Sequence, residues 1–549
     1  MSTSHPSRTP SLTLSSVSFD WPDGTPVFDE LQTTFAAGRT GLIGVNGSGK
    51  STLLKLIAGA LHPVRGTVRV EGEIGYLPQT VTLDTDSRVD EVLGIAATRA
   101  ALHAVEAGEA TEENFTAVGD DWDVEERALA TLGQLGLGHV DLDRTVGEVS
   151  GGESVLLRLA ALLLERPDVL LLDEPTNNLD LYARRRLYAA VRAWSGVLVV
   201  VSHDRELLDL VDQIADLRDG ELVWYGGNYS AYEQALAVEQ EAAERMVRVA
   251  ETDLRRQKRE LADAHVKLAR RKRYGQKMWD TKREPKVVMG ERKRTAQVAA
   301  GKHRIMHEEK LAEARERLDE AAEAVRSDDE IRVDLPHTSL PPGRTALTLR
   351  NLELRYGARA PGEWWVRGPE RIALVGRNGA GKSTLLRTLA GELAPVGGEA
   401  VAQVPLRFLP QRVDLLDEAA TVAENVARFA PGATNTMIRS RLARFLFRGS
   451  RADRVVSTLS GGERFRATLA ALMWGEPAPQ LLMLDEPTNN LDMASVRQLT
   501  GALDSYEGAL IVASHDLPFL ESLGITRWLE FGPEGELREI TSEAVGYSA

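Results

Sequence analysis

Two stretches of the chain have the residue types and the spacing of a phosphate-binding loop. Both follow the pattern G-x-x-x-x-G-K-[ST], the first with Gly44, Gly49, Lys50 and Ser51 and the second with Gly376, Gly381, Lys382 and Ser383. An apolar run precedes each loop and a helix-forming run follows it, which is the strand–loop–helix setting that such a loop requires. Glycines let backbone amides converge on phosphate oxygens, and the helix N-terminus adds partial positive charge. The lysines would then reach the terminal phosphates of a nucleotide, and the serines would ligate Mg²⁺.

Two apolar runs end in a pair of adjacent carboxylates, Asp173–Glu174 and Asp485–Glu486. A short run that is apolar throughout predicts a buried strand of a parallel sheet. We expect each aspartate to hold Mg²⁺, directly or through water. The glutamate that follows would be the general base that polarises the attacking water. The alternative is a carboxylate that only caps the next turn.

A third repeated motif, Ser-Gly-Gly-Glu, precedes each of these strands. Its residues are Ser150, Gly151, Gly152 and Glu153 in one copy and Ser460, Gly461, Gly462 and Glu463 in the other. The motif has the form of a capping box, with Ser at the N-cap and Glu at the third helical position. A helix start is the simpler interpretation. However, an exposed helix N-terminus whose amides carry no side chains also binds phosphate, and the duplication favours that role.

The motifs recur in the same order in both halves of the chain. An LPQ triplet ends at Gln79 and at Gln411, and an SHD triplet contains His203 and His515. The copies lie 332 residues apart for the phosphate-loop lysines and the glutamines, but 310 apart for the SGGE serines. The first half therefore carries 22 extra residues between its LPQ and SGGE motifs.

Composition excludes several classes of protein. Cysteine is absent from the 549 residues, which rules out disulfide scaffolds, cysteine zinc sites, iron–sulfur clusters and a cysteine nucleophile. The formal net charge of −15 argues against a generic nucleic-acid coat. The N-terminal stretch lacks the apolar core of a secretory signal, and no run reaches the ~18 apolar residues of a transmembrane helix. We therefore expect a cytoplasmic protein without a membrane domain.

Between the halves, from about Tyr232 to Asp334, heptad spacing replaces the motifs. Apolar residues recur every seven positions at Leu254, Leu261 and Leu268, and again at Leu311, Leu318 and Val325. This predicts two long helices paired as an antiparallel coiled coil, with a loop or broken helix over Tyr274 to Gly290. Positions 254–304 hold 18 Lys and Arg against 5 Asp and Glu. A basic prong on an acidic chain predicts contact with a polyanion, and a solvated helical spacer is the alternative.

The set of motifs resembles the nucleotide-binding domain of ATP-binding-cassette proteins, present twice, and covers nearly the whole chain outside the linker. The resemblance implies an α/β fold with two P-loop ATP-binding-cassette domains joined by a long antiparallel helical linker. It implies that Gln79 and Gln411 sense Mg²⁺ and the attacking water, and that His203 and His515 contact the γ-phosphate. It further implies that Trp21 and Tyr356 stack on adenine. The remaining loop residues implied to bind ATP are Asn46, Gly47, Thr52, Asn378, Gly379 and Thr384.

In that family the two domains pair head to tail, here within one monomer. One ATP would then lie between the first phosphate loop and Ser460–Gly462. The other would lie between the second phosphate loop and Ser150–Gly152. ATP would hold the halves together, and hydrolysis to ADP and phosphate would release them.

Among cassette proteins, the chain is most similar to the ABC-F family of ribosome-binding ATPases. It shares two cassettes in one chain, no membrane domain and a helical linker with a basic tip. The resemblance implies binding near the tRNA exit site of the ribosome in the ATP-bound closed state, with the linker reaching toward the P-site tRNA and the peptidyl-transferase centre. Members are translation factors or protect ribosomes from antibiotics. A transporter's ATP-hydrolysing subunit and a DNA-associated cassette ATPase are the alternatives.

The resemblance also divides the chain and assigns its RNA contacts. Residues 1–229 and 341–549 would be the cassettes, with a short arm at about 96–121 in the first. Residues 230–340 would be the linker, with its basic tip at about 270–304. The predicted contacts to rRNA and tRNA are Arg270, Arg271, Lys272, Arg273, Lys282, Arg283, Lys286, Arg292, Lys293 and Arg294.

Overall fold

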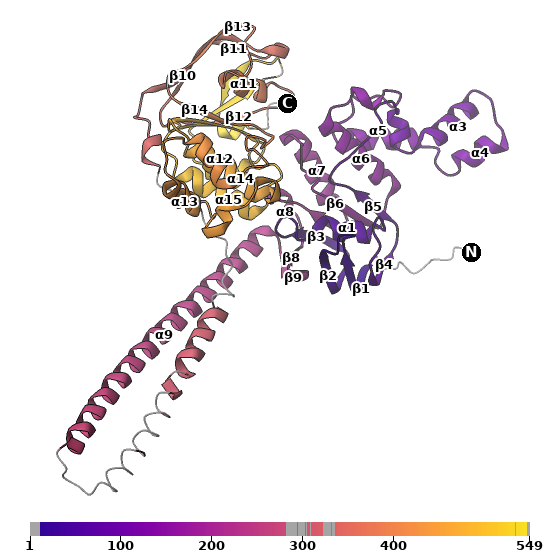
Figure 1. Cartoon of the computed structure of the whole chain (residues 1–549). Coiled ribbons are helices and arrows are strands. Elements are labelled where there is room, and N and C mark those ends of the chain that lie inside the picture. The colour runs from indigo at the N-terminus through magenta and orange to yellow at the C-terminus, as the bar shows by residue number, and fades with distance from the viewer. Residues whose placement is uncertain are drawn as a thin grey trace. The chain divides into compact units, whose positions relative to one another are not determined.

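The computed structural model describes residues 11–280, 294, 302, 305–307, 309–321, 331, 335–532 and 534–545. The chain divides into two compact units (Figure 1). One unit combines Met1–Tyr229 with Asp329–Ala549, and the other is Ser230–Asp328. The first unit contains both cassettes, and the second contains the paired helices of the linker.

The first cassette is built on a six-stranded sheet with the order β5-β6-β7-β3-β8-β9. Its strands are β3 (Gly38–Ile43), β5 (Ile74–Leu77), β6 (Val169–Asp173), β7 (Val197–Val201), β8 (Gln213–Arg218) and β9 (Glu221–Gly226). All neighbours pair in parallel except β8 and β9, which are antiparallel. A second, antiparallel sheet of order β2-β1-β4 consists of β1 (Ser11–Asp20), β2 (Pro26–Phe35) and β4 (Arg65–Glu71).

The second cassette repeats this topology strand for strand. Its six-stranded sheet has the order β14-β15-β16-β12-β17-β18, and its antiparallel sheet has the order β11-β10-β13. The strands are β10 (Thr345–Glu353), β11 (Arg359–Arg367), β12 (Arg371–Val375), β13 (Gly397–Ala402), β14 (Leu406–Leu409), β15 (Leu481–Asp485), β16 (Ala509–Ala513), β17 (Arg527–Phe531) and β18 (Leu537–Ile540). The predicted α/β fold with two cassettes is confirmed.

Strands β7 and β16 are apolar throughout, because both faces of each sheet are covered. In β12, Ile372 and Leu374 belong to one buried cluster, whereas Ala373 and Val375 belong to the other. A strand that alternates between two cores leaves no face for polar side chains. Polar chemistry can therefore begin only where such a strand ends.

The helices of the first cassette include two that the described part of the second cassette does not match. They are α1 (Lys50–Ile57), α2 (Val89–Val92), α3 (Ala96–Glu106), α4 (Glu112–Val118), α5 (Val124–Gln134), α6 (Gly151–Glu165), α7 (Leu181–Ala193) and α8 (Arg205–Leu208). Those of the second are α11 (Lys382–Leu389), α12 (Val422–Phe429), α13 (Asn435–Arg444), α14 (Gly461–Met473), α15 (Met493–Asp504) and α16 (Leu517–Ser522). The unmatched helices are α3 and α4, which lie in the stretch that holds the 22 extra residues.

The linker unit contains α9 (Tyr229–Asp280) and a helical stretch over 305–307 and 309–321 (Figure 1). Arg317 and Asp253 join the two across 3.2 Å. Leu254 is buried as predicted, but Ala264, Ala314 and Ala321 are also buried. Leu261, Leu311 and Leu318 are only half-buried. Alanines at these positions let the two helices approach closely, so part of the contact comes from small residues that a search for leucine heptads overlooks.

One prediction for the linker tip is wrong in part. The loop or broken helix expected from Tyr274 does not begin there, because α9 continues through Gly275 to Asp280. A single glycine costs a helix only about 1 kcal/mol, too little to end one of this length. Residues 281–290 lie outside the described residues, as does Val325, and the side chain of Leu268 is also outside them. No helix in the described part of the chain is long and apolar enough to cross a bilayer.

Candidate active site

Each phosphate loop joins a central strand to a helix, β3 to α1 and β12 to α11. The residues that begin these helices, Gly49 and Gly381, have φ of 103° and 108° and no side-chain cap. A Cβ on Gly49 would lie 2.7 Å from Val27, so glycine is required for space as well as for conformation. The first amides of both helices therefore face the loop with no side chain of their own in the way, which suits an anion.

The loop lysines are buried and turned into their own loops. Lys50 Nζ donates to the carbonyls of Gly44 (2.8 Å) and Val45 (3.0 Å). Lys382 Nζ makes the matching bonds to Gly376 (2.9 Å) and Arg377 (3.2 Å). Burial lowers the pKa of both lysines. A phosphate group in the loop would supply the negative charge that these buried ammonium groups otherwise draw from nearby carboxylates.

The predicted acids lie at the ends of buried strands, as expected. Asp173 is the last residue of β6 and Asp485 the last of β15. Ser51 Oγ donates to Asp173 Oδ1 at 3.0 Å, and Ser383 hydrogen-bonds Asp485. The second oxygen of each carboxylate, Oδ2 of Asp173 and Oδ1 of Asp485, is buried without a hydrogen-bond partner. A hydroxyl beside an unsatisfied carboxylate oxygen fits Mg²⁺, which takes few protein oxygens and keeps several waters.

The glutamates that follow have a strained backbone. Glu174 and Glu486 have φ of 49° and 47°, a region that costs a non-glycine residue free energy. Their amides donate across the sheet to Val201 and Ala513, both at 2.8 Å, which fixes the turn. Burial raises the pKa of both carboxyls to about 7. A carboxyl poised near neutrality in a buried turn can accept a proton from a water.

The two histidines face these glutamates. His203 and His515 follow β7 and β16, and their Nε2 atoms lie 3.1 Å from Glu174 Oε1 and 3.2 Å from Glu486 Oε1. Burial, helped by the lysine of the loop, lowers the pKa of His203 to about 3 and that of His515 well below its usual value. Both imidazoles are therefore neutral at physiological pH.

The phosphate loop of each cassette is hydrogen-bonded to the other cassette. Asn46 donates from its backbone amide to Asp492 Oδ2 (3.1 Å) and from its side chain to the Asn490 carbonyl (3.1 Å). Asn378 makes the matching bonds to Asp180 Oδ2 (3.1 Å) and the Asn178 carbonyl (2.7 Å). Residues 178–180 and 490–492, which follow the two carboxylate pairs, thus contact the phosphate loop of the opposite cassette. No role was predicted for Asp180 or Asp492, although both end the same repeated run, NNLD, at 177–180 and 489–492.

A cavity of ≈ 290 Å³ lies at the second phosphate loop. Its lining includes Lys382, Ser383, Thr384, Gln411, Glu486 and His515 from the second cassette and Asn178 and Leu179 from the first. A Cβ on Gly152, in the first SGGE motif, would lie 3.8 Å from Asn378 Nδ2. The structure therefore brings the first SGGE helix to the second phosphate loop. Gly462 of the other motif lies against Ser495 of its own cassette.

Both SGGE motifs form the predicted capping boxes. Ser150 Oγ accepts from the Glu153 amide at 3.3 Å, and Glu153 Oε2 accepts from the Ser150 amide at 2.8 Å. Ser460 and Glu463 repeat both bonds, at 3.3 and 3.0 Å. The helix start and a phosphate site are not exclusive, because the glycines that follow the N-cap add no side chain over their amides.

Four further predicted nucleotide contacts, Gln79, Gln411, Trp21 and Tyr356, are exposed. Gln79 and Gln411 follow β5 and β14, and both are exposed. Trp21 lies after β1 with its ring edge-to-face on Phe19, at 5.3 Å. Tyr356 is 92% exposed, and its neighbour Ala358 lies beside Gly381, so a free aromatic face is available next to the second loop.

The structure describes only part of the predicted RNA-binding set. Arg270, Arg273 and Arg294 are helical and exposed. Arg271 and Lys272 belong to α9, but their side chains lie outside the described residues. Lys282, Arg283, Lys286, Arg292 and Lys293 lie outside them altogether.

Two topologically identical sheets, each with a phosphate loop, a strand-end carboxylate pair and a histidine, define a twin-cassette nucleotide-binding protein. A family model described as "ABC transporter" matches residues 28–177 and 363–489. The tylosin resistance ATP-binding protein TlrC of Streptomyces fradiae is 34% identical over 530 residues, covering 90% of this chain and 92% of that protein. The energy-dependent translational throttle protein EttA of Haemophilus influenzae is 30% identical over 538 residues, covering 92% and 88%.

A solved structure of an RNase-L inhibitor has the same fold, with a TM-score of 0.58 at 19% identity over 96% of this chain and 90% of that one. The chain belongs to the ABC-F family of ATP-binding-cassette proteins. It binds ATP and is an ATP hydrolase.

Proposed function

We propose that the chain is a cytoplasmic ATPase that binds the ribosome with ATP bound and its cassettes closed, and leaves when ATP is hydrolysed. The observation that carries this proposal is its similarity, over nearly its whole length, to a protein named as an energy-dependent translational throttle. The chain would bind near the tRNA exit site of the ribosome, with the linker reaching toward the P-site tRNA and the peptidyl-transferase centre. The domain boundaries would be 1–229, 230–340 and 341–549.

The proposed ATP sites are composite. Lys50 and Lys382 would bind the terminal phosphates, with the SGGE helix of the opposite cassette on their far side. Glu174 and Glu486 would take the proton of the attacking water, and the neutral His203 and His515 would orient the γ-phosphate. Support comes from the short distances among these groups and from the raised pKa of both glutamates, to about 7.

Mg²⁺ is the proposed metal. Ser51 with Asp173 and Ser383 with Asp485 would hold it, with Gln79 and Gln411 at the margin. When bound, it would neutralise charge on the phosphates. The unsatisfied buried oxygens of Asp173 and Asp485 support this assignment.

The linker would bind RNA through its basic tip, of which Arg270, Arg273 and Arg294 are described and exposed. Replacing these three with Gln should weaken ribosome binding and flatten its salt dependence, because fewer counterions are released. The matched control replaces Arg245, Arg248 and Arg255, exposed residues of the same linker that are each paired with a glutamate one turn earlier. Equal losses in both variants would mean that the tip has no special role.

Protection of the ribosome from an antibiotic is the second candidate, favoured by the similarity to a tylosin resistance protein. A strain with the gene should grow at higher concentrations of drugs that act at the peptidyl-transferase centre than a strain without it. An unchanged inhibitory concentration across these drugs would leave the role of a translation factor.

The decisive experiment is co-sedimentation with ribosomes, using the Glu174→Gln, Glu486→Gln double variant. Blocked hydrolysis should hold the ATP-bound state, so pelleting should require ATP and should exceed that of the unmodified chain. The control adds Lys50→Ala and Lys382→Ala, which should abolish pelleting by removing ATP binding. ATP binding without ATP-dependent pelleting would refute ribosome association and leave a membrane transporter or DNA as the partner to test.

A further inference from the structure

Helix α7 of the first cassette carries an arginine that reaches the second cassette. The Arg184 side chain is only 12% exposed. Its NH1 atom lies 3.2 Å from Asp204 Oδ2 and donates to the backbone carbonyl of His515 at 3.4 Å. Its Nε donates to the Leu179 carbonyl at 3.2 Å. One guanidinium thus contacts three acceptors, one of which belongs to the other cassette.

The guanidinium is held in place on its own side. Asp204 also accepts a hydrogen bond from the Tyr188 hydroxyl at 2.7 Å, and its Oδ1 caps the start of α8 by accepting from the Leu207 amide at 3.1 Å. Tyr188 lies one helical turn after Arg184 in α7. A donor fixed in this way loses little freedom when it binds a further acceptor, so it can act as a rigid strut.

The acceptor across the interface belongs to a residue at the centre of the second ATP site. The His515 amide donates to Glu486 Oε2 at 3.3 Å, and its imidazole Nε2 lies 3.0 Å from Lys382 Nζ. The carbonyl that Arg184 binds is part of the same residue. Arg184 therefore restrains the backbone that places His515 against both Glu486 and Lys382.

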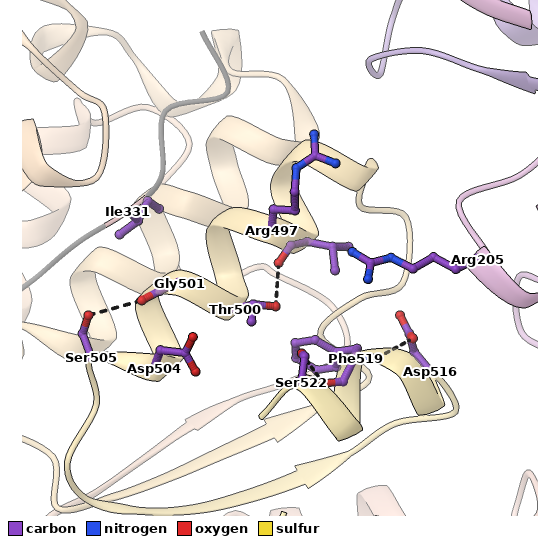
Figure 2. Close-up of a pocket in the computed structure, with 11 residues that line it drawn as sticks. Arg205, Ile331, Arg497, Thr500, Gly501, Asp504, Ser505, Asp516, Phe519 and Ser522 are labelled. Carbon is purple, nitrogen blue, oxygen red and sulfur yellow. Dashed lines mark hydrogen bonds between the residues drawn. The ribbon is translucent and has the colours of Figure 1, made fainter. Parts of the chain in front are cut away.

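The two halves differ at the position that matches Arg184, so that position cannot supply the same contact to the first ATP site. The offset of 312 residues that relates His203 to His515 relates Arg184 to Val496. Valine has no donor. Beside this valine lies a cavity of ≈ 520 Å³. Its lining includes Val496, Arg497, Asp516 (the counterpart of Asp204) and Arg205, and Figure 2 shows the Arg205 side chain extending over Asp516.

We infer that the two ATP sites are inequivalent, and that Arg184 is a positioning residue that serves the second site alone. By holding the His515 backbone from the first cassette, it makes catalysis at Lys382 and Glu486 depend on the pairing of the cassettes. At the first site, with Lys50 and Glu174, the matching residue is Val496, whose side chain cannot donate a hydrogen bond. This inference rests on the site roles proposed above and is independent of ribosome binding.

The test is steady-state ATP hydrolysis by the full chain without ribosomes, in two backgrounds. Glu174→Gln leaves only the second site turning over, and Glu486→Gln leaves only the first. Arg184→Met should lower kcat about 10- to 100-fold in the first background with little change in KM, because ground-state binding is kept while alignment is lost. In the second background kcat should stay within about twofold. Arg184→Lys, which keeps a donor, should recover part of the loss.

Arg186→Met is the matched control, since it removes the same charge from an exposed position of the same helix. It should leave kcat unchanged in both backgrounds. An equal loss of kcat from Arg184→Met in both backgrounds would mean that the arginine only stabilises cassette pairing. No loss of kcat in either background would mean that the contact has no effect on catalysis. Each result would overturn the inference. Full activity of Glu174→Gln and Glu486→Gln together would instead refute the proposed site roles.

Discussion

His515 Nε2 lies 3.0 Å from Lys382 Nζ, inside the cavity at the second phosphate loop. The two residues come from different crossovers of the sheet, the lysine from the loop after β12 and the histidine from the loop after β16. These strands are neighbours in the sheet, so their carboxyl ends bring the two side chains to one point. A terminal phosphate placed between them would meet a cation and a neutral imidazole together.

The pH dependence of hydrolysis should report the buried glutamates. Burial raises the pKa of Glu174 and Glu486 to about 7, so both lose their negative charge as the pH falls through neutrality. A general base acts only when ionised. We therefore expect kcat/KM to be constant at alkaline pH and to fall tenfold per pH unit below about 7. A profile that stays flat down to pH 5 would contradict the assignment of the base.

Removal of the metal should stop hydrolysis without abolishing nucleotide binding. Chelation of Mg²⁺ by EDTA removes the positive charge that neutralises the phosphates during hydrolysis, whereas the loop amides and lysines still bind the nucleotide. Asp173→Asn together with Asp485→Asn should raise the Mg²⁺ concentration required for half-maximal hydrolysis by about tenfold or more. Phosphate release against Mg²⁺ concentration measures this. An unchanged Mg²⁺ requirement would remove the two aspartates from the metal site.

The linker helices should not tolerate a larger residue where they approach closely. Ala314 is 1% exposed, so Ala314→Leu forces the helices apart and should cost about 1–3 kcal/mol of local stability. Hydrogen exchange of the linker amides should become faster, while exchange in the cassettes stays the same. Ala312→Leu is the control, because Ala312 is exposed in the same helix. Equal exchange in both variants would show that the two helices do not depend on this contact.

An arginine introduced at position 496 should give the first site the contact that Arg184 makes at the second. Val496→Arg places a guanidinium beside a cavity of ≈ 520 Å³, next to Asp516, in the position that matches Arg184. In the Glu486→Gln background only the first site turns over. There kcat should rise severalfold with KM little changed, which corresponds to an activation free energy lower by on the order of 1 kcal/mol. Val496→Met fills the same space without a donor and should not raise kcat. A similar rise in both variants would trace the effect to packing.

The sequence by itself determined where most residues of the candidate active site would lie. Phosphate-loop, strand-end and histidine residues were all predictable, because each has a local signature: a glycine pattern, an apolar run that ends in acids, or a repeat of the same triplet. The two-cassette fold followed from the duplication. The linker pairing was predictable from heptads, although buried alanines such as Ala264 and Ala314 escaped a pattern based on leucine, and α9 passed a glycine that sequence reasoning took as a break.

Only the tertiary structure decided which residues outside the predicted motifs meet across the cassettes. Nothing local to Asp180 or Asp492 predicts that they bind the opposite phosphate loop, since their partners lie more than 190 positions away along the chain. Arg184 is one of three consecutive arginines, and its neighbour Arg186 is exposed to solvent. Only the packing of α7 against the second cassette singles out the residue that reaches the His515 carbonyl. Residue types and spacing specify chemistry that one loop can complete, whereas chemistry shared by two cassettes depends on contacts that form when the cassettes pack together.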